Sequence, residues 1–319
     1  MPDTVIHAAF GREVRSSLPE EIQSRLADDP YNFALLGPDV WFTYQLWKRQ
    51  DGRGRTMHTT RPGDFLMALA DRCGLSVSRD ALFSYLAGFL CHYALDSVTH
   101  PYIIYMTEEK YHYPRCHMSF ERSLDALELR RASRWGQAHP VTGHYYPAGR
   151  LPASIRSDLD AVYAEIYGWR NCWKLLNRCS RRFRLFYRVV ENPKGLFSRL
   201  ARLTGSAAMK SFTYSESHFN SADVENLEGS VWQHGFDPSV RSSASFPELR
   251  EDARKIAVRL ISAAYRFVYL SDLSREGLAA EIGNRSYLSG FPADDPRNLV
   301  LPSMLPPGAV VLKAGGNPS

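Results

Sequence analysis

The 319-residue chain contains 44% hydrophobic and 23% charged residues and carries a formal net charge of +5. This balance is typical of a globular protein and excludes a disordered or collagen-like chain. The positive charge is mild, so it would favour contact with phosphates or with an anionic membrane surface but does not by itself indicate either.

The five cysteines are scattered and form no CxxC pair, which predicts free thiols in a reducing compartment. The first residues, Met-Pro-Asp-Thr-Val-Ile-His, show no basic region followed by an apolar core, so no signal peptide is expected. No apolar run approaches the roughly 18 residues of a membrane-spanning helix. We therefore expect a soluble, cytoplasmic protein.

Apolar residues recur at helical spacing along most of the chain, and period-two strand patterns are almost absent. A short entry segment carrying His7 is expected before the first helix, and Asp28-Asp29-Pro30 is expected to stop that helix. The predicted helices cover residues 12–27, 62–73, a central segment after Ser78, a segment opened by Pro114, much of 153–203, and 246–272.

Proline and polar residues predict the breaks between these helices. Pro101 is expected to kink or stop the central helix close to His100. Residues 136–152 are predicted to form a surface loop, and 205–245 a loop with short helices. The prediction is an all-α fold. It consists of a single compact multi-helix domain over residues 1–285, with metal ligands within 1–125, and an irregular Pro/Gly-rich tail over 286–319.

The predicted central helix carries a motif typical of metal binding. His92, Asp96 and His100 follow one another at spacings of four, so a helix would place all three on one face. His117 and Glu121 repeat this spacing shortly afterwards. Such groups are costly to bury in apolar surroundings unless something neutralises them. A divalent metal does so, and imidazole with carboxylate suits zinc.

Three further residues extend this candidate set to eight. Asp39 follows the helix-breaking pair Gly37-Pro38 in an aromatic neighbourhood, His58 follows a polar loop, and His7 lies near the start. One zinc takes four ligands, so eight candidates fit two or three zinc ions better than one. The set has no cysteine pattern, which favours a catalytic site over a structural one.

These residues resemble a known family. The run Gly88…His92-Tyr-Ala-Leu-Asp96-Ser-Val-Thr-His100-Pro, followed by His117-Met-Ser-Phe-Glu121, is similar to the signature of the bacterial zinc-dependent phospholipase C family. That family shares a superfamily with the single-strand-specific trinuclear zinc nucleases. The resemblance covers residues 1 to about 130. It implies an all-helical fold that binds three zinc ions in one cleft.

The resemblance also implies how the ligands divide among the ions. The first zinc would be held by Asp39, His58, His92 and Asp96. The second would be held by His100, His117 and Glu121. Asp96 would bridge to a third zinc, which His7 would also bind. Secreted members complete that third site with a processed N-terminal Trp, whereas this sequence begins Met-Pro.

The implied activity is that of a zinc-dependent phosphodiesterase, a phospholipase C-like hydrolase in which a metal-bound hydroxide cleaves the head group from a phospholipid. Asp39 is the candidate general base as well as a ligand. Peripheral membrane contact is a further expectation. Nucleic acid is a substrate only under the alternative of a single-strand nuclease or nucleotidase with the same zinc cluster. A non-catalytic, zinc-stabilised helical scaffold is the third interpretation.

A basic run in the second half of the chain stays open to two interpretations. It consists of Arg178, Arg181, Arg182, Arg184 and Arg188. By default these arginines form the solvated face of a helix. The functional alternative is a patch that binds anionic phosphates.

Overall fold

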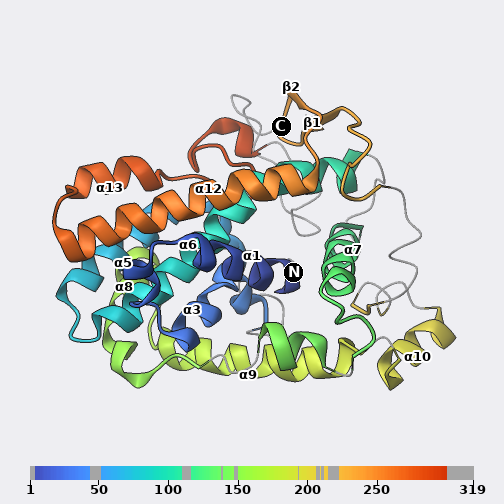
Figure 1. Cartoon of the computed structure of the whole chain (residues 1–319), viewed down its shortest axis with the longest axis horizontal. Coiled ribbons are helices and arrows are strands. Elements are labelled where there is room, and N and C mark those ends of the chain that lie inside the picture. Colours follow the sequence, from blue (N-terminus) through green and yellow to red (C-terminus); the bar gives the residue numbers. More distant parts are fainter. Residues whose placement is uncertain are drawn as a thin grey trace, which may run out of the picture.

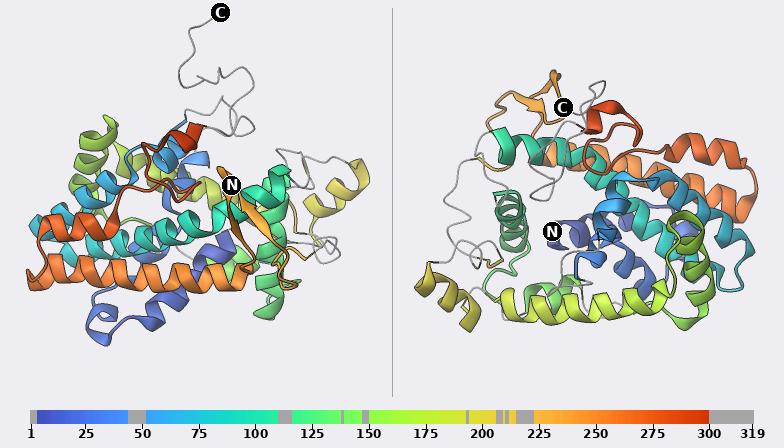
Figure 2. Two further views of the ribbon diagram at one scale, coloured as in Figure 1. Left: turned by 90° about the horizontal axis from the view of Figure 1, so that it is seen from above. Right: turned by 180° about the vertical axis from the view of Figure 1, so that it is seen from behind.

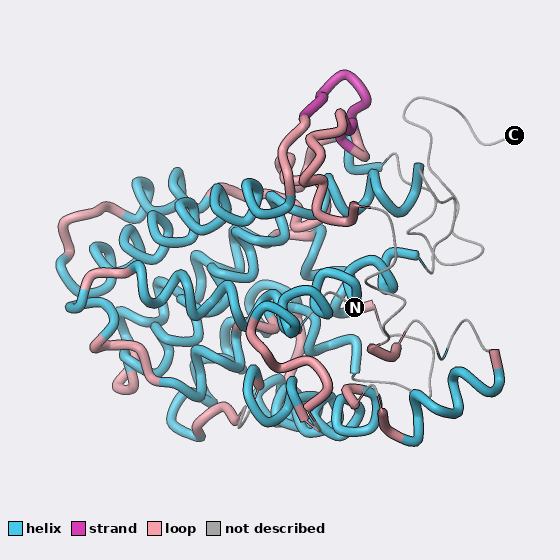
Figure 3. Tube along the Cα trace, turned by 45° about the vertical axis from the view of Figure 1, so that its right-hand side comes forward, coloured by secondary structure: helices cyan, strands magenta, loops and turns pink. Residues whose placement is uncertain are grey.

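The computed structural model describes residues 4–43, 52–109, 116–137, 139–146, 150–192, 194–205, 209, 212–214 and 223–299. Within these residues the predicted all-α fold is confirmed (Figures 1 and 3). The α-helices are α1 (Thr4–Ser17), α2 (Glu20–Gln23), α3 (Asp28–Ala34), α4 (Arg53–Thr59), α5 (Pro62–Leu75), α6 (Arg79–Ile104), α7 (Cys116–Arg131), α8 (Arg156–Tyr167), α9 (Cys172–Val190), α10 (Leu196–Thr204), α12 (Phe246–Tyr265) and α13 (Arg275–Ile282). Short 3-10 and π-helical turns join several of them.

Helix α6 lies at the centre of the fold. It is apolar on every side, and residues on all of its faces are buried, as expected for a helix surrounded by others. Helices α3 and α12 make the most extensive contacts with it, followed by α5 and α1. Figure 1 shows α12 along one edge of the molecule and α9 along the opposite edge, and the view from behind in Figure 2 agrees.

One stretch, Arg79–Thr107, would be long and apolar enough to cross a membrane by length and composition alone. However, 89% of its most apolar window is buried inside the protein, which is the pattern of a core helix. No other helix in the described ranges meets both criteria.

The start of the chain differs from the prediction. Residues 4–17 form helix α1, so His7 lies on a helix and not on an entry segment. Asp28, Asp29 and Pro30 begin helix α3 instead of stopping a helix. The physical reason is that acidic residues and proline suit the first turn of a helix, where backbone N–H groups have no intrahelical partner.

Pro101 was expected to kink or stop the central helix, and the structure contradicts the stop. Helix α6 continues through it to Ile104 and passes into the π-helical turn η2 (Tyr105–Glu109). Pro101 and its neighbours Tyr102 and Ile103 are buried, so tertiary packing outweighs the lost hydrogen bond. The predicted loop 136–152 likewise contains a buried π-helical turn, η3 (Val141–Tyr145).

A small hairpin, visible at one end of the molecule in Figure 3, lies within the segment 205–245, which was expected to be a loop with short helices; residues 206–208, 210–211 and 215–222 of that segment lie outside the described residues. Strand β1 (Trp232–His234) pairs antiparallel with β2 (Asp237–Ser242). The two residues between the strands, Gly235-Phe236, are the sequence signal that the helical interpretation overlooked, because a glycine-led two-residue loop favours a hairpin.

The predicted amphipathic helix over 246–272 is confirmed as α12 with the π-helical turn η6 (Arg266–Leu270) after it. Ser245 and Glu248 form a capping box at its start: the Ser245 side chain accepts the backbone N–H of Glu248, and the Glu248 carboxylate accepts that of Ser245. The cap defines where this helix begins its long contact with α6.

The variant Ser245→Ala should lower the free energy of unfolding by about 1 kcal/mol, because it leaves the backbone N–H of Glu248 without its cap. Urea unfolding measures this loss. Ser16→Ala, at an exposed serine of α1, is the control and should change stability by less than about 0.5 kcal/mol. Equal effects from the two variants would contradict the importance of the cap.

Candidate metal site

All eight predicted ligands lie close together in one buried region, although they come from five separate elements. His7 comes from α1, Asp39 from the 3-10 helix η1 (Gly37–Thr43), and His58 from α4. Helix α6 contributes His92, Asp96 and His100, and α7 contributes His117 and Glu121. Three subsets have ligand atoms within 4.8 Å of one another: His7 with Asp39 and His92, His58 with His92 and Asp96, and His100 with His117 and Glu121.

Asp96 lies at the junction of these subsets, and its two oxygens face different partners. Oδ2 is 2.9 Å from His92 Nε2 and 3.7 Å from His58 Nε2. Oδ1 is 3.1 Å from His7 Nε2 and 3.6 Å from His100 Nδ1. A carboxylate placed in this way can bind two ions, one through each oxygen.

The second acidic centre is Glu121. Its Oε1 is 3.0 Å from His117 Nε2 and 3.6 Å from His100 Nε2. The rings of His100 and His117 are parallel, with centroids 5.7 Å apart. The side chain of His117 is 16% exposed, whereas those of the other seven candidate ligands are at most 6% exposed. His117 therefore marks the side of the cluster nearest to solvent.

Backbone carbonyls orient two of the imidazoles. His58 Nδ1 lies 2.7 Å from the carbonyl of Gly54, and His92 Nδ1 lies 3.1 Å from that of Leu35. When such a ring is neutral and donates its Nδ1 proton to the carbonyl, its Nε2 presents a lone pair to the carboxylates. This is the arrangement that a metal-binding histidine uses.

Gly37 permits the close approach of η1 to α6. It adopts φ +48°, and a Cβ placed on it would lie 2.4 Å from ring carbons of His92. Only a residue without a side chain fits there, so Gly37 allows Asp39, two residues later, to reach His58. The Oδ1 of Asp39 is 3.3 Å from His58 Nε2.

Burial and the neighbouring charges act together on the pKa values of Asp96, His58 and His7. Burial alone would raise the pKa of Asp96, but His92, His100 and His7 hold it well below its ordinary value. Burial lowers the pKa of His58, yet Asp39 and Asp96 outweigh it and raise the value to about 10. Burial, together with His92, lowers the pKa of His7.

The polar atoms at this centre lack hydrogen-bond partners, which tests whether the residues suit a metal. Buried atoms without a partner include His92 Nε2, Asp96 Oδ2, Asp39 Oδ1, His100 Nδ1 and both oxygens of Glu121. The neighbouring charges are near one another but not aligned for hydrogen bonds. Buried groups of this kind are costly unless they bind something, and nitrogen with carboxylate oxygen is a donor set that suits zinc.

The sequence interpretation missed a contact made by Tyr287, which falls within the predicted tail over residues 286–319. Tyr287 is buried, with its ring centroid 5.3 Å from that of His58 and 5.7 Å from that of His92. Its backbone N–H donates to the carbonyl of His58. No spacing rule predicts this contact, because more than 200 residues separate Tyr287 from His58.

A buried polar network, also missed, ties α1 to α7. Asp125, one turn after Glu121, accepts the backbone N–H of Ile6 at 2.8 Å and the hydroxyl of Tyr214 at 2.6 Å. It thus caps the start of α1 from another helix. Arg122 donates to the hydroxyls of Tyr187 and Tyr214. This network places His7 beside Asp96.

Comparison with known proteins agrees with this geometry. A family model described as zinc dependent phospholipase C matches residues 6–173, just over half of the chain. All eight candidate ligands fall inside the matched segment. No curated protein and no solved structure matches the chain significantly.

Replacing Gly37 tests the close approach of η1 to His92. Gly37→Ala should cost at least about 1 kcal/mol more stability than Gly168→Ala, since both place a side chain on a left-handed backbone but only the first displaces a ring. Gly168 has φ +71°, and a Cβ added there would meet no atom within 4 Å, which makes it the matched control. Gly37→Ala should also reduce zinc per chain, measured by elemental mass spectrometry. Equal behaviour of the two variants would contradict the argument.

Zinc binding should release protons at pH 7. In the metal-free protein the His58 pKa of about 10 lies above its ordinary 6.5, so His58 is protonated at pH 7. A metal needs the neutral ring, and affinity should therefore rise with pH up to about 10. Calorimetric titration in two buffers of different ionisation enthalpy counts the protons.

Two variants separate the contribution of His58 from that of other groups. His58→Gln should release about one proton fewer per chain than the unaltered protein. His144→Gln, at a histidine that contacts Arg12 and none of the candidate ligands, should leave the count unchanged. Identical apparent enthalpies in the two buffers would show that zinc binds without displacing a proton.

Proposed function

Because the chain belongs to the zinc-dependent phospholipase C family, we propose that it hydrolyses the bond between phosphorus and the diacylglycerol oxygen of a phospholipid. The observation that carries the proposal is the junction at Asp96. One buried carboxylate faces His58 and His92 with one oxygen and His7 and His100 with the other. This junction supports a site for two or three adjacent zinc ions.

The residues would divide into ion-holding and proton-handling roles. Asp96 would join neighbouring ions, and Glu121 would hold the ion nearest to solvent together with His100 and His117. Bound zinc would neutralise the phosphate charge and lower the pKa of a water molecule in the site. Asp39 Oδ1, buried and without a hydrogen-bond partner, is proposed as the atom that accepts the proton of the attacking water.

The overall reaction balances as a hydrolysis. The oxygen of water bonds to phosphorus, the bond from phosphorus to the diacylglycerol oxygen breaks, and the water proton ends on that oxygen. The products are diacylglycerol and a phosphorylated head group. Phosphodiesters of single-stranded nucleic acid would undergo the same chemistry, so the nuclease alternative differs in substrate and not in ligand set.

Metal content and substrate choice test the proposal together. The full chain is purified without chelators or a histidine tag, and zinc per chain is measured by elemental mass spectrometry. Two or three zinc ions with hydrolysis of phosphatidylcholine support the proposal. The same zinc content with hydrolysis of single-stranded DNA alone would favour the nuclease alternative over the phospholipase. One zinc or none, with no hydrolysis, would favour the scaffold interpretation.

Asp96→Asn should be the most damaging single substitution. Loss of the charge that faces two groups of imidazoles should remove at least one zinc and lower kcat/KM on the order of 10³-fold or more, because phosphoryl transfer depends on charge stabilisation. Asp252→Asn, on the exposed side of α12, is the matched control and should behave like the unaltered protein. An Asp96→Asn variant with full zinc content and full activity would overturn the role of Asp96.

A further inference from the structure

Helices α9 and α10 present a strongly basic surface away from the metal site. Between residues 171 and 205 the sequence has nine lysines and arginines and one carboxylate, Glu191. Glu191 is buried, where it accepts from His139, from Thr142 and from the backbone N–H of Val141. The outward charge of these two helices is therefore positive only.

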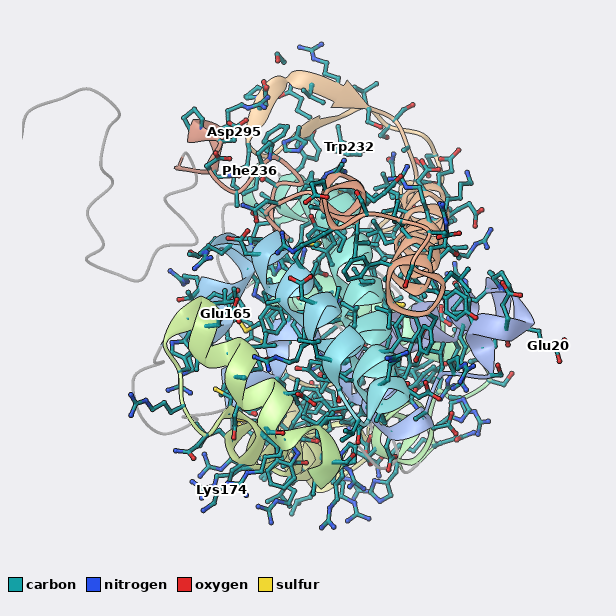
Figure 4. All side chains as sticks on the ribbon, turned by 90° about the vertical axis from the view of Figure 1, so that its left-hand side faces the viewer. Glu20, Glu165, Lys174, Trp232, Phe236 and Asp295 are labelled. Carbon is teal, nitrogen blue, oxygen red and sulfur yellow. The ribbon has the colours of Figure 1, made fainter. Side chains whose placement is uncertain are left out.

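The basic side chains lie on the solvent side. The exposed arginines of these helices are Arg178, Arg181, Arg182, Arg188, Arg199 and Arg202. Figure 4 labels Lys174, near the start of α9, at the opposite edge of the molecule from Phe236 and Asp295. Figure 1 shows α9 along the lower edge, with α10 continuing beyond its end.

Large apolar side chains are exposed among these arginines. Leu196 is 74% and Leu203 is 83% exposed on α10, and Leu200 lies on the same face between them. On α9, Leu185 and Val189 are also exposed, four residues apart. Five large apolar side chains are thus exposed on α9 and α10, whereas single, scattered exposed residues are normal on a protein surface and need no partner.

The opposite side of α9 is already occupied by the protein core. Cys179, Phe183 and Tyr187 are buried, and the carbonyl of Cys179 accepts the hydroxyl of Thr43 at 3.0 Å. That contact supports η1, which carries Asp39. The outer side of α9 faces away from this core, and apart from Cys172 and Trp173 helices α9 and α10 lie beyond the family-matched segment.

We propose that the outer side of α9 and α10, here named the basic-leucine face, docks on a bilayer that contains anionic phospholipids. Leucines would enter the acyl boundary while the arginines bind lipid phosphates, as in interfacial amphipathic helices. Charge complementarity favours this occupant: a second copy would bring the same positive charge, and a nucleic acid would use the arginines but leave the leucines exposed. Docking does not depend on the proposed hydrolysis.

Vesicle co-sedimentation with the zinc-loaded full chain tests the proposal. The unaltered protein should bind vesicles of phosphatidylcholine with phosphatidylserine better than vesicles of phosphatidylcholine alone, and added salt should weaken the binding. The variant Arg181→Gln/Arg199→Gln should bind the anionic vesicles about 20-fold more weakly. Leu196→Gln/Leu200→Gln/Leu203→Gln should lose about tenfold or more.

Matched variants elsewhere on the surface control for net charge and for exposed apolar area. Arg241→Gln/Lys255→Gln removes the same charge, and Leu75→Gln/Leu227→Gln/Leu270→Gln removes the same number of exposed leucines. Both should bind within about twofold of the unaltered protein. Equal losses in the control variants, or no preference of the unaltered protein for anionic vesicles, would overturn the proposal.

Two further readouts distinguish other occupants and other failures. If the basic-leucine face variants changed oligomeric mass or single-stranded DNA binding and left vesicle binding intact, a second copy or a nucleic acid would replace the bilayer. All variants should keep the activity of the unaltered protein on a short-chain, monomeric phosphatidylcholine. If the protein binds vesicles as described but has no hydrolytic activity, the docking proposal stands and only the proposed function is rejected.

Discussion

The burial of one carboxylate governs the arrangement of this protein. Asp96 is 2% exposed in the middle of a helix whose every side is covered, and a carboxylate there is costly unless opposite charge surrounds it. Four imidazoles lie around it, from α1, α4 and α6. The helices that bring these rings together must pack closely, and glycine at position 37 is one consequence.

The supporting contacts link the site to distant parts of the molecule. Asp125 caps α1 from α7, so the position of His7 depends on the helix that carries Glu121. Tyr187 of α9 accepts from both Thr4 and Arg122 and joins this network to the far edge of the fold. Helix α9 therefore supports the candidate metal site from its buried side, while its outer side carries the basic-leucine face proposed to meet lipid.

The spacing of residues predicted their relative positions correctly where they lie on the same helix. A spacing of four placed His92, Asp96 and His100 on one face of α6, and the same rule related His117 to Glu121. It served less well at Pro101 and at residues 4–17, where tertiary packing outweighed local preference. The hairpin at residues 232–242 was missed because β1 has only three residues and β2 is mostly polar and exposed, so neither strand shows an alternating apolar pattern.

The helical class, the types of the candidate ligands and the helix faces that carry them could be inferred from the sequence, because they follow from side-chain chemistry and the period of a single helix. Helix packing sets which oxygen of Asp96 faces which histidine, brings Tyr287 against the cluster and lets Asp125 cap α1. Those contacts join residues far apart in the chain. Their geometry depends on how whole helices pack, and no local periodicity contains that information.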